Sequence, residues 1–123
     1  MNIMRIIFYL INIIFILFYL YPGSLSGYIL YGDFQQQPQI SNDFLNISLN
    51  HFCAFIFLSF FGVWTYFNDQ KINLVIKYLF TLTIILELFH IIIPERTFEY
   101  GDLLGNILGV LIIYVPYKIW KKN

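Results

Sequence analysis

Four runs of apolar residues alternate with polar segments along the chain. They cover residues 3–21, 47–67, 72–93 and 102–117. Each is close to or above the ~17 residues that a helix needs to cross the hydrocarbon core of a bilayer. Unpaired backbone groups are costly in hydrocarbon, and four segments are too few to close a barrel. The pattern therefore predicts an all-α integral membrane protein, in which one transmembrane domain over residues 1–123 forms a small four-helix bundle.

The polar segments predict the connections between these helices. Residues 22–46 form the longest polar stretch, which we expect to be an external loop that partly lies at the membrane interface through residues 28–31. Residues 68–71 predict a short turn. Proline cannot continue the helical hydrogen-bond ladder without cost, so Pro94 should end the third span and Pro116 should bend or end the fourth.

The first run has two interpretations. A cleaved signal peptide would place Arg5 before its apolar region and the small residues Ser24 and Ser26 after it. A retained helix is favoured by the length of the run and by Tyr19 and Tyr21, which are typical of an aromatic belt at the membrane interface.

Composition supports a lipid environment. Hydrophobic residues make up 59% of the chain and charged residues 11%, whereas a soluble domain carries roughly 25% charged residues. The net charge is zero and no basic face interleaved with aromatic residues occurs, which argues against a nucleic-acid partner. Cys53 is the only cysteine, so no internal disulfide can form. The bias toward Ile, Phe, Tyr, Asn and Lys indicates an AT-rich genome, and we expect a bacterial cytoplasmic membrane.

The cations predict the orientation of the chain. If the chain crosses the membrane four times, six of its seven cations lie at one face, namely Arg5, Lys71, Lys77, Lys118, Lys121 and Lys122. Only Arg96 lies at the opposite face. The positive-inside rule therefore places both ends of the chain and the 68–71 turn in the cytoplasm.

Polar residues within the apolar runs share one depth. A charged group in the bilayer costs at least ~2.5 kcal/mol on insertion scales, so such groups seldom occur there without a role. Near the outer ends of spans two to four, and in the loop between the last two, lie His51, Glu87, His90, Arg96, Asp102 and Asn106. Gly105 and Gly109 offer a small-residue face for close helix approach. We expect these polar side chains to converge in a pocket that opens outward.

Within this pocket, Arg96 is expected to pair with Glu87, Asp102 or both, because opposite charges in a low-dielectric site attract strongly. Two interpretations of such a network stay open. It binds a ligand or carries out chemistry, or it only holds the bundle together, with Asn106 bridging the helices.

The spacing of these residues resembles a known family. Residues 87–109 read ELFHIIIPERTFEYGDLLGNILG, which is similar to the signature E-x-x-Q-x-x-x-P-x-R-x-x-x-x-x-D-x-x-x-N-x-x-G of VanZ-like membrane proteins. The matching positions are Glu87, Pro94, Arg96, Asp102, Asn106 and Gly109, and His51-Phe52 resembles the His-Phe helix start of the family. His90 stands in place of the usual glutamine, and Ile47-Ser48 in place of an Asp-Lys pair. The resemblance implies a link to low-level teicoplanin resistance in the founding member, and no established molecular activity across the family.

Three functions are compatible with these features. In the first, the pocket binds or modulates an envelope lipid, a cell-wall precursor or a glycopeptide-type antibiotic, with Arg96 and Asp102 among the ligand-binding residues together with Asn106 and His90. In the second, an intramembrane hydrolase or transferase uses Glu87 as general base, His51 as proton shuttle and Arg96 to stabilise developing negative charge.

The third function is that of a channel or transporter, but the chain lacks the paired broken helices expected of transporters, and a pore would need several copies of the chain. We expect no cofactor. The enzyme of the second function could use a metal, for which the plausible ligands are His51, Glu87, His90 and Asp102. The family's glutamine at the His90 position argues against such a metal site. The sequence leaves the oligomeric state open.

Overall fold

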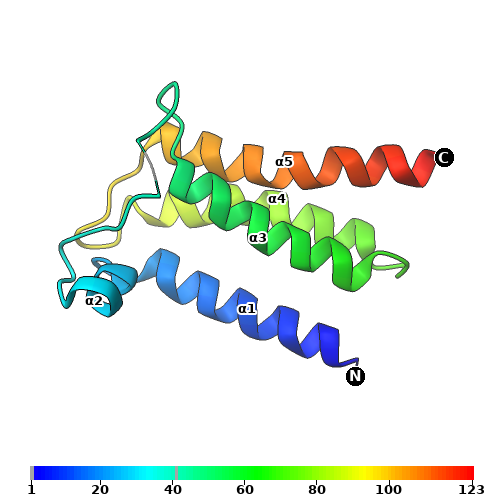
Figure 1. Cartoon of the computed structure of the whole chain (residues 1–123), viewed down its shortest axis with the longest axis horizontal. Coiled ribbons are helices and arrows are strands. Elements are labelled where there is room, and N and C mark those ends of the chain that lie inside the picture. Colours follow the sequence, from blue (N-terminus) through cyan, green and yellow to red (C-terminus); the bar gives the residue numbers. More distant parts are fainter. Residues whose placement is uncertain (1, 41) are drawn as a thin grey trace.

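The computed structural model describes residues 2–40 and 42–123, and the described part of the chain is all-helical (Figure 1). Its elements are α1 (Ile3–Leu20), α2 (Leu25–Tyr31), α3 (Leu49–Tyr66), α4 (Ile72–Phe89) and α5 (Tyr100–Lys122). The four long helices are each long and apolar enough to cross a membrane. The predicted fold class, a small transmembrane helical bundle, is confirmed.

Helix α2 lies within the segment that the sequence indicated as a loop. The Ser24 side chain accepts a hydrogen bond from the Gly27 amide and caps its first turn. Gly32 ends the helix in the left-handed conformation, with φ of 69°. Residues 28–31 are all exposed, and their location at the membrane interface stays a prediction.

Two helix ends differ from the predicted ones. Helix α4 ends at Phe89 rather than at residue 93. Residues 90–92 continue as a tighter turn, in which each amide donates to the carbonyl three residues earlier, and Pro94 disfavours the helical conformation in the residue before it. Helix α5 continues through Pro116 to Lys122, so Pro116 does not end it. Pro116 and the residue one turn earlier, Ile112, are both exposed, so the proline ring meets no neighbouring helix there.

Helix α5 packs closely on α3 through small residues. Gly105 and Gly109 face the backbone of α3: a Cβ atom at Gly105 would lie 2.6 Å from the Ser48 carbonyl oxygen, and one at Gly109 would lie 2.6 Å from that of Phe52. The predicted small-residue face is confirmed. In lipid, such close approach is a main source of helix association, because hydrocarbon solvates apolar side chains as well as a neighbouring helix does.

Polar pairs and one aromatic contact join α1 to α3 and α4. The pairs are the Arg5–Asp69 ion pair, the Tyr9 and Tyr66 hydroxyls 2.9 Å apart, and the Asn12 amide nitrogen 2.6 Å from the Tyr78 hydroxyl. The Phe8 ring lies against Gly62, where an added Cβ would come within 3.1 Å of it. These contacts hold α1 along its length.

Both ends of the chain and the α3–α4 turn lie at one end of the bundle, opposite α2 and the long polar segments (Figure 1). Arg5, Lys71 and the lysines near the C-terminus lie at this end, whereas Arg96 lies in the α4–α5 connection at the other. The distribution matches the one from which the cytoplasmic location of both ends was predicted.

We predict that green fluorescent protein fused after Asn123 fluoresces in bacterial cells, because it folds in the cytoplasm. Alkaline phosphatase inserted at Gly32 should be active, because it folds in the oxidising exterior. The matched control is the phosphatase fused after Asn123, which should be inactive. Activity of that fusion, with a dark fluorescent fusion, would show the opposite orientation.

Gly105→Ala should destabilise the bundle by about 1–3 kcal/mol, since the new Cβ would force the α3 and α5 backbones apart. Thermal unfolding in detergent, followed by circular dichroism, measures the change. Leu104→Phe is the control, because Leu104 is exposed on the same turn and the added bulk meets no helix. Equal stability of the two variants would refute the packing argument.

Candidate functional site

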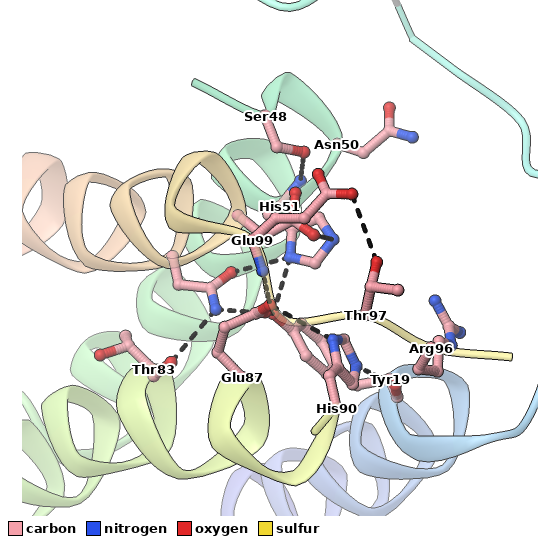
Figure 2. Close-up of polar contacts among 12 residues, drawn as sticks. Tyr19, Ser48, Asn50, His51, Thr83, Glu87, His90, Arg96, Thr97 and Glu99 are labelled. Carbon is pink, nitrogen blue, oxygen red and sulfur yellow. Dashed lines mark hydrogen bonds and ion pairs between the residues drawn. The ribbon is translucent and has the colours of Figure 1, made fainter. Parts of the chain in front are cut away.

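The predicted polar residues meet at the end of the bundle opposite the two termini (Figure 2). His51 lies in the first turn of α3, Glu87 in the last turn of α4, and His90 directly after it. Asp102 and Asn106 lie in the first two turns of α5. Hydrogen bonds and close ionic contacts connect these five residues through shared partners, so their predicted convergence is confirmed.

Tyr19, from α1, lies at the centre of this network. Its hydroxyl is 2.7 Å from Glu87 Oε2, 2.7 Å from His51 Nδ1 and 2.6 Å from Asn106 Nδ2. Its assignment to an interfacial aromatic belt was wrong, because the residue is only 8% exposed. The available signal was its depth near the outer end of the first span, which is also the depth of Glu87 in the third.

The network fixes where the hydrogens lie. The Thr83 carbonyl can only accept, so the Asn106 atom 3.2 Å from it is the amide nitrogen. The Asn106 oxygen therefore faces His51 Nδ1 at 3.1 Å, and this nitrogen carries the hydrogen. Tyr19 accepts from Asn106 and donates its single hydrogen to Glu87. This leaves His51 Nε2, which faces Asp102 Oδ2 at 3.5 Å.

The Glu87 carboxylate accepts the last hydrogen bond of this network, in which Asn106 donates to Tyr19 and Tyr19 donates to Glu87. It is fully buried. Oε2 accepts from Tyr19, and Oε1 accepts from the Glu99 backbone amide at 3.0 Å. His90 Nδ1 lies 3.4 Å from Oε1, while its Nε2 donates to the Tyr19 carbonyl at 2.9 Å. Because a carbonyl can only accept, Nε2 carries the hydrogen of this bond, and Nδ1 has no hydrogen-bond partner among the described residues.

Arg96 does not form the predicted ion pair. Among the described residues, no salt bridge joins it to Glu87 or Asp102. Its guanidinium instead donates to the Tyr21 carbonyl at 3.1 Å and the Phe18 carbonyl at 3.2 Å. The last carbonyls of a helix lack partners within it, and those of α1 are met by this side chain. Burial lowers the pKa of Arg96, but a guanidinium remains charged at neutral pH.

Two cavities of different character adjoin the network. An apolar cavity of about 420 Å³ lies between α1 and α3, with Phe15, Phe18, Ala54 and Phe57 in its wall. A polar cavity of about 230 Å³ is lined by loop residues and by Ser48, Glu99 and Asp102. The walls of both include Gln37, Asn50, His51, His90 and Arg96. The two cavities therefore adjoin each other at these five side chains.

Comparisons with known proteins do not identify this arrangement. The chain matches no protein-family model, no curated protein and no solved structure. Its resemblance to VanZ-like proteins therefore rests on the spacing of residues 87–109 and on His51-Phe52, and it stays a prediction.

Tyr19→Phe should lower the stability of the bundle by about 1–3 kcal/mol, because Glu87 and Asn106 each lose a buried hydrogen-bond partner. Unfolding in detergent measures the loss. Tyr28→Phe removes the same hydroxyl from an exposed side chain of α2 and should leave stability unchanged. If both substitutions behave alike, the hydroxyl of Tyr19 does not stabilise the network.

Proposed function

We propose that this protein binds an amphiphilic lipid of the bacterial cell envelope, with the head group in the polar cavity and the apolar chain between α1 and α3. The observation that carries this proposal is that an apolar and a polar cavity adjoin at one set of side chains, which includes His51 and Arg96. An amphiphile has the same two-part character, and neither part would be left in an unsuitable environment.

The apolar cavity also discriminates among the ligands that the sequence suggested. An envelope lipid or a lipid-linked cell-wall precursor carries a long apolar chain that can lie against Phe15, Phe18 and Phe57. A water-soluble ligand would use only the polar cavity. The resemblance to VanZ-like proteins adds lipid-bearing glycopeptide antibiotics to the candidates, and the cavities favour ligands that have a lipid chain.

An intramembrane hydrolase or transferase is the alternative, and one observation changes the roles within it. Glu87 already receives three polar contacts and is fully buried, so it is poorly placed to take a proton from a substrate. His51 and Asp102, in contrast, both line the polar cavity. In this alternative they would be the acid–base pair, and Glu87 would position Tyr19 and the His51 ring.

Ala54→Phe tests the binding proposal, because the added ring would fill the apolar cavity next to Phe57 without touching the buried network. The protein is purified in mild detergent, incubated with a lipid extract of the host membrane and analysed by native mass spectrometry. We expect the affinity of the Ala54→Phe protein for lipid to be about tenfold lower than that of the wild type, which corresponds to ~1.4 kcal/mol.

Leu74→Phe is the matched control, since Leu74 is exposed on α4 and adds the same ring outside the cavities. It should retain bound lipid. Unchanged lipid binding by a folded Ala54→Phe protein would exclude the apolar cavity as the binding site.

A further inference from the structure

His51, Glu87 and Asp102 bring one nitrogen and two carboxylate oxygens close together; His51 and Asp102 line the polar cavity, and Glu87 is fully buried next to them. One potential ligand atom of each residue lies within 4.8 Å of the others. The three side chains come from three helices, α3, α4 and α5. From this cluster we infer a divalent-cation site of the type that binds Zn²⁺.

The shortest separation in the cluster fits a shared ion. Zn²⁺ binds imidazole nitrogen at roughly 2.0–2.1 Å and carboxylate oxygen at roughly 2.0–2.2 Å, so two ligands of a tetrahedral site lie about 3.4 Å apart. His51 Nε2 and Asp102 Oδ2 are 3.5 Å apart. Glu87 supplies the third ligand atom, within 4.8 Å of the other two, so the three atoms draw closer together when an ion binds.

The protonation state of His51 also fits. Because Nδ1 carries the hydrogen that faces Asn106, Nε2 of the neutral ring has a free lone pair directed at Asp102. Metal-binding histidines are typically held in this way, with the second ring nitrogen donating to an oriented acceptor. Tyr19 and the Glu99 amide hold the Glu87 carboxylate similarly.

Charge balance gives an independent argument. Two carboxylates, Glu87 and Asp102, lie close together, with side chains 0% and 18% exposed. Among the described residues, no lysine or arginine forms an ion pair with either. Arg96 is the nearest candidate in the fold, and it donates instead to carbonyls of α1. A divalent cation would neutralise both carboxylates where, among the described residues, the basic side chains in contact with them are the imidazoles of His51 and His90.

If the protein binds a lipid as proposed above, the cation site also determines which head group it accepts. Among its described lining residues, the polar cavity has the four carboxylates of Asp43, Glu95, Glu99 and Asp102 against the guanidinium of Arg96, so its net charge disfavours an anion. Three protein ligands leave a coordination position open on a Zn²⁺ ion. A phosphate-bearing head group would bind there through the metal, and we assign this chemical class to the ligand.

Titration of the detergent-solubilised, chelator-treated full chain with Zn²⁺ alone, followed by calorimetry, tests the cation site. We expect one ion per chain, and a loss of affinity of more than about tenfold in Asp102→Asn and in His51→Gln. Asp33→Asn is the matched control: it removes a carboxylate from an exposed position outside both cavities, and its side-chain oxygen can still accept from the Gln35 amide, so its affinity should equal that of the wild type.

Thermal unfolding of each variant shows whether it is folded, and Asp102→Asn decides the question if His51→Gln does not fold, since Asp102 lies at the edge of the network. Co²⁺ substituted for Zn²⁺ should give the visible absorption of a low-coordinate site with nitrogen and oxygen ligands. Absence of Zn²⁺ binding by the wild type, or equal binding by a folded Asp102→Asn protein, would overturn the site.

Binding of phosphatidylglycerol and of uncharged diacylglycerol, each with and without Zn²⁺, tests the head group. Only phosphatidylglycerol should bind more tightly with the metal. If Zn²⁺ binds but leaves phospholipid affinity unchanged, the cation site stands and the head-group assignment is wrong. If both lipids bind and Zn²⁺ does not, the lipid-binding function stands without the metal.

Discussion

A buried carboxylate in a membrane protein needs donors, and the end of this bundle opposite the two termini is organised around those of Glu87. Its two oxygens receive the Tyr19 hydroxyl, the Glu99 amide and a close contact from His90. These partners come from α1, from the loop before α5 and from the end of α4. A charge left unpaired at this depth would cost several kcal/mol, so the three segments are constrained to meet there.

Close packing of α5 on α3 brings the remaining polar groups to the same place. With only hydrogen atoms at Gly105 and Gly109, the α5 backbone can approach the carbonyls of Ser48 and Phe52. This places Asn106 within hydrogen-bond distance of His51, and Asp102 beside the other nitrogen of that ring. The glycine face therefore acts on the site indirectly, by setting the distance between two helices.

Helix α1 has a different relation to the bundle. Much of its surface is exposed, and its polar contacts with the rest of the chain occur at a few side chains along its length. Beside Phe15 and Phe18 the space between α1 and α3 remains open as the apolar cavity. The carbonyls at the end of α1 are held by Arg96 and His90, so the same loop that lines the polar cavity also positions Tyr19.

Hydropathy along the sequence determined the four spans, because a bilayer requires every crossing segment to be apolar and internally hydrogen-bonded. Counting residues from the span ends also determined the common depth of His51, Glu87, Asp102 and Asn106. Depth does not specify which partner a side chain meets. Only the tertiary structure decided that Tyr19 turns inward to link three helices, and that Arg96 meets the carbonyls of α1 rather than an acid. Both outcomes depend on how the helices are rotated about their axes, which side-chain packing sets and a one-dimensional pattern of polarity does not record.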